Sequence, residues 1–316
     1  MTALCAGVAL AVVLPAPVGR AVAETTGVLA ARTAGVASLA GVGRVRGHRV
    51  GGNGLNGLRG LAERRDAVAG NLRRVGGDSV GGLELRRQVD EAFGSYARYW
   101  AESLRLPSLS RRELEAGMTA EGMEHLEAAR EKGRGAIFAL PHLGGWEWGG
   151  AWLASLGVPV SVVVEALGDR EVFEWFVSFR RRLGMEVIAT GADAGRRCLA
   201  ALAANRVLCL LSDRVVGATP GVEVEFFGER TRLPAGAVTL SYRTGAPVLP
   251  AAVYFGRGSS EHRTVILPPL EAPRSQRFRE DVVRGTQLLA HELERLIRAA
   301  PAQWHVMQPN WPAAGG

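Results

Sequence analysis

The chain has few cysteines and no long hydrophobic run, and both absences exclude classes of protein. Its 316 residues include three cysteines, Cys5, Cys198 and Cys209, without a CxxC pair, so neither a disulfide framework nor a structural zinc site is indicated. The apolar run at 3–13 is shorter than the roughly 20 residues that cross a bilayer. No Lys or Arg precedes it, unlike in a secretory signal peptide. We therefore expect a reducing, cytosolic setting.

Positive charge is concentrated where aromatic residues are missing. Residues 1–75 contain ten Arg, three acidic residues and no Phe, Trp or Tyr, whereas residues 76–316 balance 28 basic against 28 acidic side chains. A protein that is basic throughout, as a nucleic-acid coat would be, is excluded, and the missing aromatics argue against stacking on single-stranded nucleic acid. We expect no nucleic-acid partner. The basic segment fits either an anionic membrane surface, where each nearby Arg contributes about 1 kcal/mol, or a solvated arm.

The composition favours one globular body behind a different N-terminal segment. Hydrophobic residues make up 47% of the chain and charged residues 22%, which is enough for a sizeable core. Eight of the twenty residues at 41–60 are Gly, and with no apolar period this stretch predicts a linker. We expect a basic, glycine-rich, membrane-associating segment at 1–63 and a catalytic domain at 64–316.

Hydrophobic periodicity predicts an α/β fold after two N-terminal helices. Apolar side chains spaced three to four apart predict a helix at 86–105, and a second helix is expected at 113–132. Short apolar runs then alternate with helical stretches, which predicts a central, mostly parallel sheet flanked by helices. The expected strands are 137–140, 158–164, 185–189 and 207–211, extended by strands near 222–227, 248–254 and 264–267. The expected helices are 146–156, 169–183, 195–204, 235–243 and 277–299.

Four side chains follow the predicted strands and are candidates for a site. His142 follows the first strand, Glu165 the second, and Asp213 and Arg214 the fourth. Because the carboxyl ends of parallel strands meet at one edge of a sheet, we expect these groups to converge there. Asp213 is the better candidate to orient the imidazole, as an acid does in hydrolytic triads.

Glu147 cannot share a helix face with His142, since five residues correspond to about 140° of rotation. We expect His142 in the loop and Glu147 in the first turn of the next helix, where the helix dipole favours a carboxylate. Purely structural roles stay open as alternatives. His142 would then be a hydrogen-bonded loop residue, Glu147 a helix cap, and Arg214 an ion-pair partner of Asp213.

Other chemistries receive little support from the sequence. The remaining five histidines show no two-ligand helical spacing, so no metal site is expected. The G-x-S-x-G elbow of a serine hydrolase is missing, and Cys198 and Cys209 lie in a predicted helix and strand, where thiols are usually inert. A histidine base acting directly on a bound hydroxyl requires no covalent intermediate.

Five segments resemble a known family in its own order. His142 and Glu147 match the H-x-x-x-x-D/E motif of the bacterial lysophospholipid acyltransferase superfamily. The closer resemblance is to the lipid A lauroyl/myristoyl acyltransferase branch, and within it to actinobacterial phosphatidylinositol mannoside acyltransferases. The segments are 95–107 (SYARYWAESLRLP), 140–148 (LPHLGGWEW), 205–214 (NRVLCLLSDR), 221–236 (GVEVEFFGERTRLPAG) and 301–311 (PAQWHVMQPNW).

The resemblance implies transfer of a fatty acyl group, palmitoyl by expectation, from acyl-CoA to the 6-hydroxyl of a mannose in phosphatidylinositol mannosides. It implies no cofactor beyond acyl-CoA as co-substrate, an anionic mannosylated phospholipid as partner, and a peripheral location on the cytoplasmic face of the inner membrane. His142 would be the general base and Asp213 its relay partner, with Glu147 at the second motif position.

The remaining candidate residues are assigned around that base. By resemblance, Glu165 and Arg180 line the acceptor and active-site region. Gly144 and Gly145 supply candidate amide donors for the oxyanion, with Arg214 as a side-chain alternative. Trp146 is a candidate to line an acyl groove, although core packing is as good an explanation for it.

The sequence departs from the family pattern in ways that leave the acceptor open. Asp213 stands where Glu is more usual, Val215 stands where Asp often follows the Arg, and residues 1–60 do not resemble the family's hydrophobic N-terminal helices. The alternatives are acylation of another glycolipid or lysophospholipid, hydrolysis when no acceptor is bound, and a non-catalytic lipid-binding protein of the same fold.

Overall fold

The computed structural model describes residues 13–39, 53–165, 170–217, 221–258, 260–272, 274–275 and 277–312. Most of the apolar run at 3–13 and the glycines at 41–52 lie outside these residues. The chain divides into two compact units by contacts. One is helical and comprises Met1–Arg105, Arg257–Ser260 and Ile297–Gly316. The other is an α/β unit comprising Leu106–Gly256 and Glu261–Leu296.

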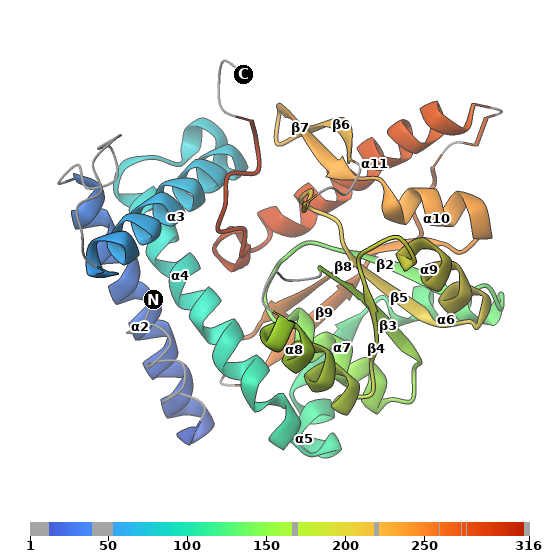
Figure 1. Ribbon diagram of the computed structural model, residues 1–316, viewed down its shortest axis with the longest axis horizontal. Coiled ribbons are helices and arrows are strands. Elements are labelled where there is room, and N and C mark those ends of the chain that lie inside the picture. Colours follow the sequence, from blue (N-terminus) through green and yellow to red (C-terminus); the bar gives the residue numbers. More distant parts are fainter. Residues whose placement is uncertain are drawn as a thin grey trace. The chain divides into compact units, whose positions relative to one another are not determined.

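Three long helices build the helical unit: α2 (Ala16–Leu39), α3 (Asn53–Gly76) and α4 (Gly82–Arg105). Helices α2 and α4 pack against each other at Gly27, where a Cβ atom would lie 2.3 Å from the carbonyl oxygen of Phe93. Short 3-10 turns, η1 (Gly77–Ser79) and η3 (Pro301–Gln303), belong to the same unit. N-terminal helices are therefore present, as the predicted fold class has them, and α4 confirms the helix expected at 86–105, whereas no helix was expected at the positions of α2 and α3. Figure 1 shows these helices in blue and cyan.

Helix α3 begins at Asn53, so the linker prediction for 41–60 is wrong over 53–60, while 41–52 lie outside the described residues. Glycine destabilises a helix interior by about 1 kcal/mol relative to alanine, a cost that burial elsewhere on the helix can outweigh. In α3 that burial comes from Ala62, Val68 and Leu72, each at most 2% exposed. The division of the chain at residue 63 stays a prediction.

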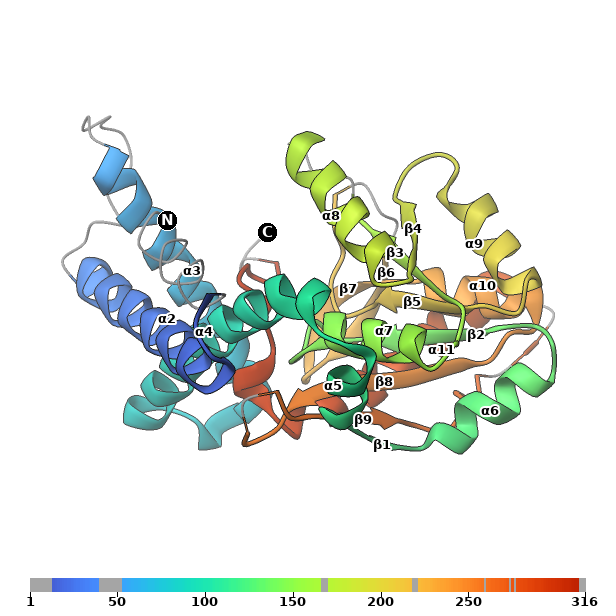
Figure 2. The ribbon, with the colours of Figure 1, turned by 90° about the horizontal axis from the view of Figure 1, so that it is seen from below.

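The α/β unit contains a seven-stranded sheet in the order β1-β9-β8-β2-β5-β3-β4. All of its pairings are parallel except that of β8 with β9, so the predicted α/β class with a mostly parallel sheet is confirmed. Figures 1 and 2 show helices on both of its faces. The strands are β1 (Met118–Glu121), β2 (Ala136–Leu140), β3 (Val160–Val164), β4 (Glu186–Ala189), β5 (Val207–Leu211), β8 (Val248–Phe255) and β9 (His262–Ile266). The helices are α5 (Arg111–Ala116), α6 (Met123–Glu131), α7 (Trp146–Ser155), α8 (Arg170–Arg182), α9 (Ala194–Ala203), α10 (Gly236–Thr244) and α11 (Phe278–Arg298), with a turn η2 (Leu106–Ser108).

Two sequence expectations for this unit are wrong in part. The helix expected at 113–132 is interrupted by β1, because Gly122 adopts a left-handed φ of 81° and approaches the carbonyl of Ile266, which a Cβ atom would reach at 2.0 Å. The strand expected near 222–227 does not extend the sheet. It forms a separate antiparallel hairpin, β6 (Gly221–Phe226) with β7 (Glu229–Pro234).

The core of the α/β unit lies around its central strands. Every residue of β8 is buried, as expected for a strand covered on both faces. Phe138 of β2 and Leu249 of β8 belong to one cluster with Trp148 and Trp152 of α7. Helix α7 is therefore held firmly against the sheet, and its N-terminus is held with it.

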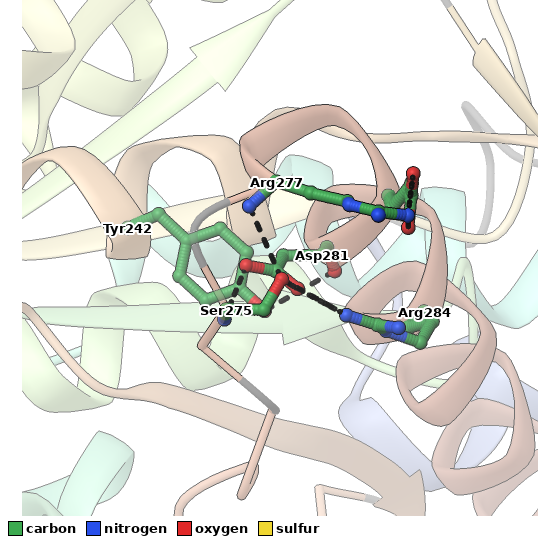
Figure 3. A network of polar contacts seen from close by, with 6 residues as sticks. Tyr242, Ser275, Arg277, Asp281 and Arg284 are labelled. Carbon is green, nitrogen blue, oxygen red and sulfur yellow. Dashed lines mark hydrogen bonds and ion pairs between the residues drawn. The ribbon is translucent and has the colours of Figure 1, made fainter.

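A polar network fixes the chain that leads into α11 (Figure 3). The carboxylate of Asp281 accepts hydrogen bonds from the amide of Ser275 at 2.6 Å and from its hydroxyl at 2.8 Å, and it pairs with Arg284. The Tyr242 hydroxyl donates to the carbonyl of Asp281 at 3.1 Å. Burial raises the pKa of Asp281, but the hydrogen bonds from Ser275 and Arg284 outweigh it and hold that pKa below its ordinary value.

Candidate active site

The side chains of His142 and Asp213 meet at the carboxyl edge of the sheet. Strands β2 and β5 pair in parallel up to Leu140 and Leu211, and each candidate residue follows its strand by two positions. Because the two strands end at paired residues and both candidates follow at the same distance along the chain, the candidates lie side by side. Asp213 Oδ1 lies 2.6 Å from His142 Nδ1, and Asp213 Oδ2 accepts the main-chain amide of His142 at 2.8 Å. The predicted convergence of these two residues is confirmed.

This geometry defines the tautomer of the imidazole. Asp213 is fully buried, with 0% exposure, and an ionised carboxylate only accepts hydrogen bonds. Nδ1 of His142 therefore carries the proton that it donates to Asp213, which leaves Nε2 as the basic nitrogen. The His142 side chain is 14% exposed, so the ring is largely enclosed.

The turn after His142 engages most of its amides within the protein. The His142 amide donates to Asp213, the Leu143 amide to Pro141 O at 2.8 Å, and the Gly145 amide to Val253 O at 3.0 Å. The Gly145 donor is thus already used, which argues against our assignment of it to an oxyanion. The Gly144 amide is outside these three bonds and is the better candidate, together with the amide of Trp146, which stands at the first position of helix α7, where amides have no intrahelical acceptor.

The two glycines of the turn are required for different reasons. Gly144 has a φ of 60°, a left-handed conformation that favours glycine. Gly145 has a negative φ of −102°, so a left-handed conformation does not explain it, and its constraint is the space that a Cβ atom would need beside His262. The helix α7 begins directly after Gly145, and the positive end of that helix dipole lies at the turn.

Glu147 is paired with Arg180, from the first turn of α7 to helix α8. Arg180 Nε donates to Glu147 Oε2 at 3.1 Å, and a second, shorter bond joins Arg180 Nη2 to Oε1. Glu147 is 3% exposed. Burial, together with the charge of Glu147, raises the pKa of the Cys209 thiol to about 12, so this thiol is not a nucleophile at neutral pH.

Glu165, Arg214 and Trp146 are the remaining candidates. Glu165 is exposed and directly follows β3. Arg214 is half-buried next to Asp213 in sequence. Trp146 is half-buried and meets the His142 ring edge-on, with ring centroids 5.7 Å apart.

Sequence reasoning missed two residues that support the turn, Val253 and His262. Val253 of β8 supplies the carbonyl that holds Gly145, and His262 of β9 packs beside it. Both lie more than a hundred residues beyond the turn, and no local pattern indicates such contacts. Among the described residues, no three or more His, Cys, Asp or Glu side chains are arranged to hold a metal ion. None of the helices in the described ranges combines the length and apolar composition needed to cross a bilayer.

A family model described as bacterial lipid A biosynthesis acyltransferase matches residues 52–312. The chain belongs to this acyltransferase family. Proteins named phosphatidylinositol mannoside acyltransferase are similar to it: one from Mycobacterium tuberculosis is 38% identical over 69% of this chain and 68% of the relative. Another, from Mycolicibacterium smegmatis, is 37% identical over 71% of this chain and 72% of the relative. A Haemophilus influenzae lipid A biosynthesis acyltransferase is 22% identical over 70% of this chain and 68% of the relative.

The family resemblance inferred from the five sequence segments is thereby confirmed, and the chain is an acyltransferase enzyme. Within this acyltransferase the departure at Asp213 has a structural explanation. The aspartate follows β5 closely enough for both carboxylate oxygens to reach His142, one at the ring and one at the main chain. A shorter carboxylate therefore preserves contact with the imidazole.

Proposed function

We propose that this enzyme transfers a fatty acyl group, palmitoyl by expectation, from acyl-CoA to the 6-hydroxyl of a mannose of phosphatidylinositol mannosides. The observation that carries the proposal is the Asp213 carboxylate, which holds both the ring and the main chain of His142. The acceptor is supported by the mycobacterial relatives named for that lipid, at 37–38% identity against 22% for the lipid A enzyme.

His142 acts as the general base in this reaction. Nε2 removes the proton of the mannose hydroxyl as its oxygen attacks the thioester carbonyl, and the buried Asp213 stabilises the imidazolium that forms. The carbon–sulfur bond then breaks, and the thiolate of CoA takes the proton that the imidazolium holds. The acyl group moves directly to the acceptor, so the step needs no acyl-enzyme and no cofactor.

The turn after His142 stabilises the negative charge that develops on the thioester oxygen. The amides of Gly144 and Trp146 are the donors that we assign to this role, with Arg214 as a side-chain donor. The N-terminus of α7 adds the positive end of a helix dipole at the same place. We assign Trp146, whose ring lies edge-on to that of His142, to contact with the acyl chain.

Glu147 and Arg180 hold the surroundings of the base. Their two hydrogen bonds fix α8 against the first turn of α7, so a buried carboxylate is compensated at the edge of the site. Glu165 at the end of β3 contacts the acceptor. We place the enzyme peripherally at the cytoplasmic face of the inner membrane, because its acceptor is an anionic membrane lipid.

The test uses purified protein with palmitoyl-CoA and three acceptors: phosphatidylinositol dimannoside, a lipid A precursor and a lysophospholipid. We expect acylated dimannoside from the wild type and from His291→Ala, a control at an exposed histidine, but not from His142→Ala. If only one of the other two lipids is acylated, that lipid and not the mannoside is the acceptor. Thioester cleavage without transfer would indicate a hydrolase, and a folded protein without either activity would indicate a lipid-binding protein.

A further inference from the structure

Gly145 is a glycine because of a histidine that lies 117 positions away in sequence. A Cβ atom at position 145 would lie 2.6 Å from Cδ2 and 2.8 Å from Nε2 of His262, and 3.2 Å from Cε1 of Phe255. Real Cβ contacts essentially never fall below 3.0 Å. The φ of Gly145, −102°, lies outside the left-handed region that favours glycine. The ring of His262 therefore occupies the space that a residue at 145 would need.

The ring of His262 is itself held firmly. It is 3% exposed and stacks on Trp148 of α7 with centroids 4.2 Å apart and planes 23° from parallel. The ring of Phe255 packs against that of His262, with centroids 5.6 Å apart. The main-chain amide of His262 donates to Gly117 O at 2.8 Å, and its carbonyl accepts from the Thr119 hydroxyl at 3.3 Å. Ring and backbone of His262 are thus each held by contacts with neighbouring elements.

Gly145 is thus fixed from two directions. Its amide is bonded to Val253 O at 3.0 Å, and its Cα lies against the His262 ring. At the other end of the turn, Asp213 holds the His142 amide. Between these anchors lies Gly144, whose amide, with that of Trp146, we assign to the oxyanion. Donors held in place before the reaction stabilise charge without reorganisation, whereas a misplacement of about 1 Å costs about a hundredfold in rate.

We propose that His262 is a positioning residue, which sets the location of the Gly144 and Trp146 amides by packing against Gly145. It acts through its shape and stacking, and its nitrogens take no part in proton transfer. This inference rests on the proposed acyl transfer, because the amides that His262 positions are the oxyanion donors proposed for that reaction.

The test is a double-substitution cycle on the full chain with palmitoyl-CoA and phosphatidylinositol dimannoside. Gly145→Ala should lower kcat about tenfold or more, with the KM for the thioester little changed, because the donors move while binding contacts remain. His262→Ala should also lower kcat. In the double variant the new methyl group enters the vacated space, so the combined loss should be at least several-fold smaller than the product of the single losses. Gly236→Ala, at the start of α10 with nothing within 4 Å of its Cβ position, is the matched glycine control.

A second variant separates packing from chemistry. His262→Phe keeps an aromatic ring on Trp148 and should retain most of the activity, with the pH profile of kcat unchanged, since roughly volume-conserving core substitutions are tolerated best. Losses that multiply in the cycle would overturn the proposal. So would a His262→Phe enzyme as inactive as His142→Ala with a wild-type melting temperature, because the nitrogens would then be required.

Thermal unfolding distinguishes failure of this inference from failure of the proposed function. If the wild type transfers no acyl group, the function is wrong, yet melting temperatures still report whether positions 145 and 262 are coupled. We expect the loss in the double variant to be smaller than the sum of the single losses. Additive losses in melting temperature would remove His262 as the support of the turn.

Discussion

Asp213 holds His142 at two points, the ring nitrogen Nδ1 at 2.6 Å and the main-chain amide at 2.8 Å. One carboxylate therefore sets both the tautomer of the imidazole and the path of the backbone that carries it. Because the carboxylate is fully buried, both hydrogen bonds are shielded from bulk solvent. The orientation of Nε2 is built into the fold and needs no substrate to create it.

A side chain at position 144 should lower kcat by more than the accompanying loss of stability explains. Gly144→Ala at φ 60° costs on the order of 1 kcal/mol in backbone strain and shifts the turn, so kcat should fall about tenfold or more. Gly133→Ala is the matched control, because Gly133 also has a left-handed φ, 68°, and open space around its Cβ position. Similar destabilisation in both, with loss of kcat only at 144, is expected. Equal kcat in the two variants would contradict the role of the turn.

The pair formed by Glu147 and Arg180 should dominate the stability of the α7–α8 contact. Arg180→Met removes the cation that pairs with the buried carboxylate of Glu147, which costs about 3–5 kcal/mol. The double variant Glu147→Gln with Arg180→Met should lose less than the two single losses together. Arg111→Met, which removes an exposed pair with Glu115, should change stability by less than about 1 kcal/mol. Urea unfolding of the five proteins measures this, and additive losses would show that the pair is not coupled.

Asp281 should make stability depend on acid pH. Its pKa lies below the ordinary value because hydrogen bonds from Ser275 and Arg284 outweigh its burial. A carboxyl group with a lowered folded-state pKa stabilises the fold above its unfolded pKa, about 3.9, and loses that contribution as pH falls through the folded value. Asp281→Asn should therefore lower the melting temperature most above about pH 5, with the difference shrinking below about pH 4. Asp193→Asn, at an exposed pair, should show little difference at any pH. A difference for Asp281→Asn that grows towards acid pH would reverse the sign and contradict this explanation.

The arginines of α3 should contribute to membrane binding. Arg64 and Arg73 are exposed, and each Arg near an anionic surface contributes about 1 kcal/mol. Changing both to Gln should weaken binding to vesicles of phosphatidylinositol and phosphatidylcholine by about 30-fold at low salt. The same charge change at Arg230 and Arg277, which are 85% and 75% exposed in the other unit, is the control. Equal effects of the two double variants would assign binding to net charge alone.

The sequence predicted the main sheet of the α/β unit well, because its strands are short apolar runs between helices. It also predicted the meeting of His142 with Asp213, since that follows from strand ends at one edge of a parallel sheet. The interruption at Gly122 was not predicted, because it depends on a close approach to Ile266 from a distant strand. Local periodicity contains no information about such contacts.

The contacts that support the site could likewise not be predicted from the sequence. Glu147 was expected in the first turn of a helix, which is where it lies, but its partner Arg180 depends on how α8 is rotated against α7. The bond from Gly145 to Val253 joins a turn to a strand over a hundred residues later. This bond uses the Gly145 amide, which the sequence indicated as a candidate oxyanion donor.

Acyl transfer from palmitoyl-CoA to phosphatidylinositol dimannoside by His142→Ala, Asp213→Asn and their double variant tests the central claim most directly. If Asp213 acts only by orienting and stabilising the imidazole, Asp213→Asn should lower kcat about 10³- to 10⁴-fold, and adding it to His142→Ala should cost little more. Acceptor KM should change little in Asp213→Asn. Undiminished product from His142→Ala, or losses that multiply in the double variant, would contradict a histidine base oriented by Asp213.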